Sequence, residues 1–320
     1  MTVPKVLVTG ASGLVGEAVI FRLLVDKRFC PIAAARGATR FHGLCDVAQF
    51  DLTHAKIQLV LDGVQVVIHA AARVHVMNET AENSLAEFRK VNVEGTLKLA
   101  RCAAASGVKR FIFISSIKVN GENSVLGKPF EADDPPNPLD PYGVSKHEAE
   151  FALKKLGTET GMEVVIIRPP LVYGPGVKGN FLTMLSWLDR GIPMPLGAIR
   201  NQRSLVAIAN LVSLIVTCID HPASANQAFL VSDGVDLSTT QLLRRLSKAL
   251  DKPVRLLPLP EWSVRLVASM LGKRAMVERL CGSLQVDISK NYKLLGWTPP
   301  FNVDKAILQT VGYYQERQAK

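Results

Sequence analysis

A glycine-rich turn between an apolar run and a helical pattern constrains the fold more than any other feature of the sequence. It lies in residues 6–20 and is typical of a strand, a turn and a helix. Gly10 permits the tight turn, Gly13 lets an anionic group approach bare backbone, and Gly16 lets the helix pack closely on the strand. Free N–H groups at the start of such a helix attract phosphate, so the turn predicts a dinucleotide site. Its expected contacts are Gly10, Ser12, Gly13, Leu14, Val15 and Gly16.

The spacing of this turn is G-x-x-G-x-x-G, not the more common G-x-G-x-x-G, and a purely structural turn is the alternative. Further along, short apolar runs alternate with helical patterns, which is typical of a doubly wound parallel sheet. The expected strands are 31–35, 47–51, 64–69, 108–115, 163–168 and 227–232, with one long helix at 84–106.

Longer, proline-rich segments follow residue 170 and indicate a second, smaller lobe. The sequence therefore predicts an α/β fold with two parts. A doubly wound, dinucleotide-binding (Rossmann-type) domain takes residues 1–170 plus about 204–234. An interleaved α/β substrate lobe takes residues 171–203 and 235–320.

Composition narrows the class of protein. No apolar run in the 320 residues reaches the length of a membrane span, and the chain enters its first strand without a signal-peptide pattern, so we expect a cytoplasmic protein without stable membrane insertion. The five cysteines are scattered, which predicts reduced thiols and no metal site. The net charge of +10 is spread along the chain, which disfavours nucleic acid; it suits either solubility or a cleft for a small polyanion.

The type of dinucleotide depends on the end of the second strand, where an acid would bind the adenosine ribose. Arg36 stands there, 20 residues beyond Gly16. A guanidinium can hold a 2′-phosphate, so Arg36, with Arg40 as a possible second contact, favours NADP(H) over NAD(H); a solvated surface arginine is the alternative. Other contacts expected after the third and fourth strands are Asp51, Leu52, Ala70, Ala71 and Ala72.

Residues suited to proton transfer follow Asp140, which is expected to cap a helix. Tyr142 and Lys146 would then project from one face of that helix. A lysine cation and an oxidised nicotinamide both lower the pKa of a phenol, so Tyr142 can exchange a proton with an alcohol or ketone. Ser116, at the end of a core strand, can hold the same oxygen, and Asn92 can steady the lysine.

In this order, along nearly the whole chain, these motifs resemble the extended short-chain dehydrogenase/reductases, a group of nucleotide-sugar epimerases, dehydratases and ketoreductases. The resemblance implies reversible hydride transfer at a sugar carbon, with Tyr142 as acid and base, Lys146 orienting the nicotinamide ribose, and Ser116 bonding the reacting oxygen. It also places Asn92 and Pro169 near the cofactor. The segments that carry it are 9–16, 69–72, 92–96, 115–116, 142–146 and 168–176.

The resemblance further implies a UDP-sugar substrate. Asn180 follows the Y-G-P-G turn and, with Arg203 and Arg279, is expected at the nucleotide diphosphate; an ordinary helix cap is the alternative for Asn180. Leu171 and Ser204 replace residues common in relatives, which indicates a remodelled sugar site. The expected substrate contacts are Ser116, Lys118, Tyr142, Asn180, Arg203 and Arg279.

The two residues after Ser116 bear on the reaction. Relatives that remove water carry an Asp-Glu pair there, whereas this chain has Ile117 and Lys118, which argues against dehydration. Net reduction of a 4-keto sugar and 4-epimerisation remain. Arg36 favours the reductase, as does the similarity of segments 72–78 and 115–122 to bacterial enzymes that reduce UDP-4-keto-6-deoxy-N-acetylglucosamine to UDP-N-acetylquinovosamine for surface polysaccharides.

The main alternative is a UDP-glucose or UDP-N-acetylglucosamine 4-epimerase with tightly bound NAD. A non-catalytic NADP-sensing protein is a distant one, since such a protein could dispense with Tyr142. Relatives often pair through two long helices, here 84–106 and 141–160, which predicts a homodimer with a four-helix interface. The apolar stretch 262–271 is expected to be core or lid of the smaller lobe, with membrane docking as the alternative.

Overall fold

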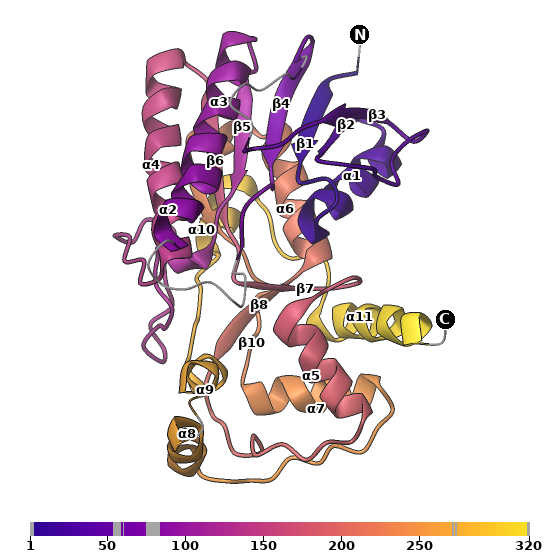
Figure 1. The fold of residues 1–320 in the computed structure, drawn as a ribbon, viewed down its shortest axis with the longest axis vertical. Helices are drawn as coiled ribbons and strands as arrows, with labels where there is room; N and C mark the ends of the chain where they lie inside the picture. The colour runs from indigo at the N-terminus through magenta and orange to yellow at the C-terminus, as the bar shows by residue number, and fades with distance from the viewer. Residues whose placement is uncertain are drawn as a thin grey trace.

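A seven-stranded sheet forms the centre of the larger part of the molecule (Figure 1). The computed structural model describes residues 3–53, 59, 61–74, 84–270, 272 and 274–318. All pairings in this sheet are parallel, and the strand order is β3-β2-β1-β4-β5-β6-β9. The strands are β1 (Lys5–Thr9), β2 (Cys30–Ala35), β3 (Asp46–Gln49), β4 (Val64–His69), β5 (Arg110–Ile114), β6 (Glu163–Arg168) and β9 (Ala228–Leu230). The predicted doubly wound α/β fold is confirmed.

Helices cover both faces of this sheet because its strands are apolar on both sides. Val6 and Val8 of β1 face a core that contains residues of α1 (Leu14–Asp26) and α6 (Ile208–Asp220). Leu7, between them, faces the opposite core, built with α3 (Thr96–Ala105) and α4 (Pro141–Thr160). The side chains of β1 thus alternate between two cores, as the period of a strand requires. Because helices cover the two faces of the sheet, the carboxyl ends of its strands are the place where a binding site is expected.

The helix predicted at 84–106 is interrupted. The structure has α2 (Ser84–Phe88), then a π-helix (Arg89–Gly95), and only then α3. A Cβ on Gly95 would lie 2.9 Å from the backbone oxygen of Leu52, so this turn passes very close to the segment after β3. Such wide turns are frequent at functional sites, and this one carries Asn92.

The smaller part of the molecule is built on a second sheet with the order β10-β8-β7 (Figure 1). Its core contains Phe181, Leu185, Leu243 and Ile307. The elements are β7 (Leu171–Tyr173), α5 (Gly179–Asp189), β8 (Arg203–Ala207), β10 (Asp236–Leu237), α7 (Thr239–Ala249), α8 (Glu261–Met270), α9 (Arg274–Cys281) and α11 (Val303–Gln318). Helix α10 (Ser289–Leu295) lies instead against β9 of the large sheet. The domain boundaries and the dimer interface stay predictions.

Helix α8 covers most of the apolar stretch noted in the sequence. Val264 belongs to the second core, whereas Trp262, Leu266 and Met270 are exposed. Of the large apolar side chains that the structure describes in this helix, only Val264 is therefore part of the core. Within the described ranges, no helix combines the length and apolarity needed to cross a bilayer.

Candidate active site

The glycine turn packs against the residues that follow β4. Gly10 has a φ of +71°, and a Cβ there would lie 2.7 Å from the backbone nitrogen of Ala71. A Cβ on Gly16 would lie 2.3 Å from the backbone oxygen of Gly10. Helix α1 starts after Gly13, whose position as N-cap brings no side-chain acceptor to the first N–H groups. These groups and the bare backbone fit a dinucleotide pyrophosphate.

The residues predicted to contact the adenosine end of the dinucleotide differ in their surroundings. Arg36 follows β2 directly and is exposed. Arg40 pairs with Glu17 of α1 and lies 4.7 Å from the centroid of the Phe21 ring, so its guanidinium is held against that helix. After β3, the Asp51 carboxylate accepts hydrogen bonds from the backbone N–H and the hydroxyl of Thr53, and Leu52 is buried in the core.

His69 directly precedes Ala70, Ala71 and Ala72, three small residues called here the alanine shelf, and the sequence did not indicate its partners. It is fully buried, with Nδ1 2.6 Å from Oγ1 of Thr9 and Nε2 2.9 Å from Oγ1 of Thr96. Burial lowers the pKa of His69 to about 3, and the charge of Lys146 acts in the same direction. A neutral imidazole therefore joins β1, β4 and α3 beneath the shelf.

Helix α4 begins as predicted. Asp140 is its N-cap, and the carboxylate accepts a hydrogen bond of 2.7 Å from the backbone N–H of Gly143. Tyr142 lies in the first turn, with its ring edge-on to Phe88 at 5.9 Å between centroids. Burial raises the pKa of Tyr142, and the charge of Asp140 raises it further.

Lys146, one turn later, is buried. Its Nζ donates a 2.8 Å hydrogen bond to the backbone oxygen of Ile114 and lies 4.3 Å from the centroid of the Phe113 ring. Burial lowers the pKa of Lys146 to about 7. The expectation that Lys146 lowers the pKa of Tyr142 is therefore not met by the protein alone, where burial and Asp140 dominate. A cationic nicotinamide beside the phenol would act in the lowering direction.

Asn92 of the π-helix is buried and bridges two segments. Its Oδ1 accepts from the backbone N–H of Arg73 at 2.8 Å, while Nδ2 donates to the backbone oxygen of Arg73 and to Oγ of Ser145, both at 3.1 Å. It thus ties the loop after β4 to the residue preceding Lys146.

Ser116 follows β5 and begins the 3₁₀ turn Ile117–Val119, where its Oγ accepts from the backbone N–H of Lys118 at 3.3 Å. The backbone N–H of Ile117 donates to the oxygen of Pro169 at 3.0 Å. Ser116 and Pro169 both line a cavity of about 390 Å³. Tyr142 and Lys146 are not among the described residues that line it, but α4 packs against the turn that carries Ser116.

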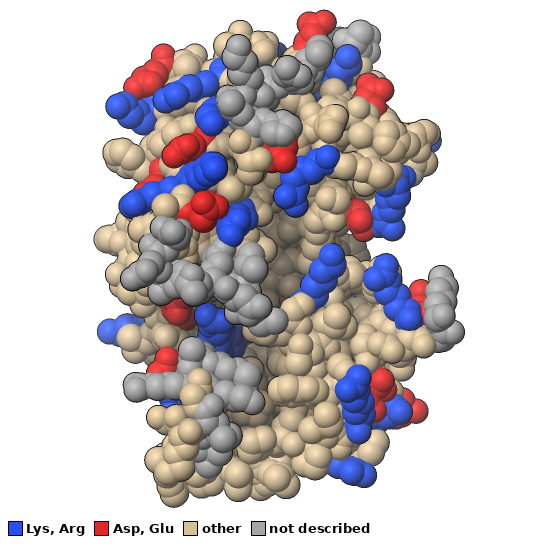
Figure 2. Space-filling model, in the orientation of Figure 1, with Lys and Arg blue, Asp and Glu red and all other residues tan. Residues whose placement is uncertain are grey.

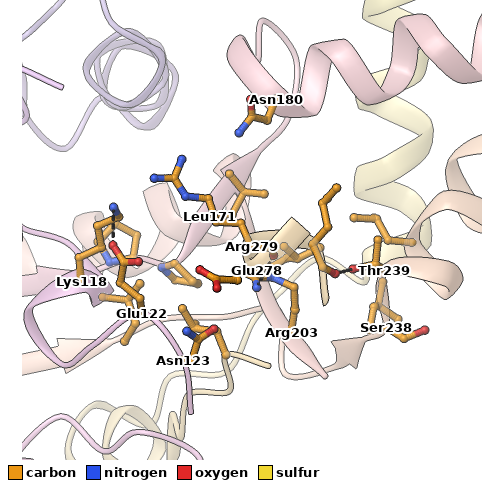
Figure 3. Close-up of a pocket in the computed structure, with 18 of the residues that line it drawn as sticks. Lys118, Glu122, Asn123, Leu171, Asn180, Arg203, Ser238, Thr239, Glu278 and Arg279 are labelled. Atoms are coloured by element: carbon orange, nitrogen blue, oxygen red, sulfur yellow. Dashed lines mark hydrogen bonds and ion pairs between the residues drawn. The ribbon is translucent and has the colours of Figure 1, made fainter. Parts of the chain in front are cut away.

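The cavity brings together the residues predicted for the substrate. Figure 3 shows Lys118 and Glu122 at one end, Ser238 and Thr239 at the other, and the two arginines between them. The predicted residues in its lining are Ser116, Lys118, Asn180, Arg203 and Arg279. Glu122, Asn123, Ser238, Thr239 and Glu278 also line it but were not predicted. Ser238 could have been found as a helix cap, because it forms a capping box with Gln241, but a cap by itself does not indicate a ligand.

The two arginines are linked. Nη1 of Arg203 donates to the backbone oxygens of Arg279 at 2.7 Å and Gly282 at 2.9 Å, and burial lowers the pKa of Arg203. Asn180 lies inside α5, whose N-cap is Lys178, so it is not the cap of that helix. Figure 2 shows that this face of the molecule is hollowed near its middle, with Lys and Arg side chains around the hollow. Such an arrangement suits a small polyanion.

A family model described as "NAD dependent epimerase/dehydratase family" matches residues 6–232. The chain belongs to this family. A Vibrio cholerae protein described as a UDP-glucose 4-epimerase is 48% identical over 311 residues, which cover 96% of this chain and 94% of the relative. The region matched by the family model contains the glycine turn, Ser116 and the start of α4 with Tyr142 and Lys146.

Solved structures show the same fold. UDP-glucose 4-epimerase from Thermotoga maritima, solved with UDP-glucose, has a TM-score of 0.76 at 22% identity, covering 98% of this chain and 99% of its own. UDP-glucuronic acid 4-epimerase from Bacillus cereus, solved with NAD, has a TM-score of 0.79 at 19% identity with the same coverage.

Proposed function

We propose that this family member is an NAD-dependent 4-epimerase of a UDP-sugar, with UDP-glucose or UDP-N-acetylglucosamine as substrate. The observation that carries the proposal is the 48% identity to the V. cholerae protein over 96% of this chain, a length that takes in both parts of the molecule. This reverses the preference of the sequence for net reduction. The cavity supports it, since two arginines suited to a diphosphate lie in the same space as Ser116.

The side chains then have distinct roles. Arg203 and Arg279 hold the diphosphate, and the Ser116 hydroxyl holds the C4 oxygen of the sugar. Tyr142 takes the proton of the C4 hydroxyl during oxidation and returns it during reduction. The glycine turn and the start of α1 would hold a dinucleotide, whose nicotinamide would supply reversible hydride transfer at C4. The sugar must turn in the cavity between these steps, and no net oxidation results.

Net reduction of a 4-keto sugar with exchangeable NADPH is the second candidate. It is favoured by Arg36, which is exposed directly after β2 where a 2′-phosphate would lie. Residues 75–78 of the segment that resembles the C4 reductases lie outside the described residues.

Identification of the bound dinucleotide separates the two candidates. The purified protein is denatured, the released dinucleotide is identified, and fresh protein is incubated with UDP-glucose and with UDP-N-acetylglucosamine. We expect close to one NAD per chain and formation of the 4-epimer without added cofactor. An empty site that binds NADPH reversibly, with no epimer formed, would contradict the proposal.

Tyr142→Phe tests the assigned acid and base. The variant is expected to keep NAD and lose turnover by at least about 100-fold, the usual contribution of a general acid–base group. The matched control is Tyr292→Phe, because Tyr292 is exposed on α10. Equal turnover in the two variants would remove Tyr142 from the mechanism.

A further inference from the structure

A cluster of three charged side chains lies where the turn of Ser116 meets the first turn of α4. The ammonium of Lys118 bonds to Oε1 of Glu122 at 3.0 Å and to the carboxylate of Asp140. The other carboxylate oxygen of Asp140 caps α4 through Gly143. Lys118, two residues after Ser116, therefore connects the Ser116 turn to the N-cap of the helix that carries Tyr142.

The backbones of these two turns are also in close contact. A Cβ on Gly143 would lie 2.9 Å from the backbone oxygen of Lys118 and 3.2 Å from its Cβ, so a larger residue would push the turns apart. The backbone N–H of Asn137, just before α4, donates to the oxygen of Val119 at 2.8 Å. The positions of Ser116 and Tyr142 relative to each other are thus set at this junction.

Charged side chains lie on several of the described elements around Tyr142. Asp140 and Lys146 lie on its own helix, and Lys118 and Glu122 lie on or just after the turn packed against that helix. The π-helix, which also packs against α4, carries Lys90, Glu94 and Arg89, and Arg89 pairs with Glu148. The α2 residue that faces the phenol, Phe88, is uncharged. Asp140 raises the pKa of Tyr142, and a cation paired with Asp140 offsets part of that effect.

We propose that Lys118 is a positioning residue for proton transfer: its ion pair with Asp140 fixes the Ser116 turn against the first turn of α4 and neutralises the negative charge next to Tyr142. The inference rests on the proposed function, because it takes Tyr142 as the acid and base. It also gives Lys118 a role besides the predicted contact with the sugar, since two carboxylates of the protein already bind its ammonium.

The test measures the phenol directly and does not require turnover. The protein is labelled with [¹³Cζ]tyrosine and loaded with NAD⁺, and the resonances of its five tyrosines are followed with pH. Tyr142→Phe identifies the resonance of Tyr142. Lys118→Met is expected to raise the pKa of Tyr142 by about one unit, the effect of losing one nearby opposite charge. Lys118→Arg is expected to retain the wild-type value.

Two further variants separate electrostatics from loss of structure. Lys118→Met combined with Asp140→Asn removes both charges and keeps a good helix cap, so the pKa is expected to return to its wild-type value. Glu122→Gln removes the competing carboxylate and is expected to lower the pKa; it carries the test if Lys118→Met does not fold. An unchanged pKa in Lys118→Met, a raised pKa that persists in the double variant, or an unchanged or raised pKa in Glu122→Gln overturns the proposal.

Activity supplies an independent readout. If the protein is an active epimerase, the rising limb of its kcat–pH profile is expected to shift to higher pH in Lys118→Met, together with the pKa of Tyr142. In Lys118→Arg the limb is expected at the wild-type pH. If the wild-type protein turns over no UDP-sugar, the proposed function fails, but the tyrosine titration still decides the role of Lys118.

Discussion

The buried ion pair between Glu150 of α4 and Arg168 of β6 provides the sharpest test of how α4 is held in place. Their side chains are 2% and 3% exposed, and the shortest of three N–O contacts is 2.6 Å. Glu150 also accepts a 2.5 Å hydrogen bond from the hydroxyl of Ser115, the residue before Ser116. Glu150→Met leaves a buried guanidinium without a carboxylate, which costs about 3–5 kcal/mol of unfolding free energy.

The rest of the Arg168 environment places the expected loss toward the lower end of this range. Arg168 keeps hydrogen bonds to Oδ1 of Asn120 at 3.0 Å and to the backbone oxygen of Ala132 at 3.2 Å. These acceptors satisfy N–H groups but carry no charge. We therefore expect about 3 kcal/mol, read from urea unfolding followed by far-UV circular dichroism and analysed with a common m-value.

The same helix offers a matched control. Glu148 binds Arg89 through both carboxylate oxygens, but the two side chains are 31% and 48% exposed. Glu148→Met is expected to cost about 0–1 kcal/mol. Equal losses in the Glu148 and Glu150 variants would refute the argument from burial. So would a variant with both Glu150→Met and Arg168→Met that is no more stable than Glu150→Met alone, because replacing a whole buried pair removes the unpaired charge.

Two other predictions concern the glycine turn and the buried His69. Gly16→Ala places a Cβ 2.3 Å from backbone and is expected to abolish NAD binding in a fluorescence titration, whereas Gly312→Ala in α11, which meets nothing within 4 Å, is expected to leave binding intact; equal binding by both would contradict the packing argument. His69 has a pKa of about 3 when folded and 6.5 as its ordinary value. The unfolded chain thus binds the extra proton, and stability should fall by up to about 1.4 kcal/mol per unit as pH drops from 6.5 toward 3. His69→Gln should flatten this dependence in acid unfolding, and an unchanged slope would exclude His69 as its source.

Local patterns in the sequence were sufficient to predict the large sheet, the glycine turn and the start of α4. The glycine turn depends on backbone clearances that only glycine provides, and the structure has them at Gly10 and Gly16. The cap and proline before Tyr142 likewise determine where α4 starts. These features are encoded within a few neighbouring residues, which is why a sequence can reveal them.

The π-helix, by contrast, could not be predicted from periodicity. Apolar spacing in 84–106 fits one continuous helix, and the wide turn appears only where Gly95 meets Leu52 and Asn92 bonds to the Arg73 backbone. Both contacts join segments that are distant in the sequence. The partners of Arg203 are of the same kind, since they are backbone oxygens more than 70 residues further along the chain.

Charged residues show most clearly why the rest of the site was hidden. Arg168 ends a strand and Lys118 lies in a short turn, and the sequence indicated an ion pair with a carboxylate of the protein for neither of them. In the structure each is paired with a carboxylate of α4 or its cap, Glu150 for Arg168 and Asp140 for Lys118. The two α4 carboxylates, Asp140 and Glu150, lie on either side of Tyr142 and Lys146 along the chain, so α4 is joined at its cap to the Ser116 turn and further along to β6. The sequence motifs thus identify Ser116, Tyr142 and Lys146, whereas ion pairs between elements help to determine how these residues are placed relative to one another.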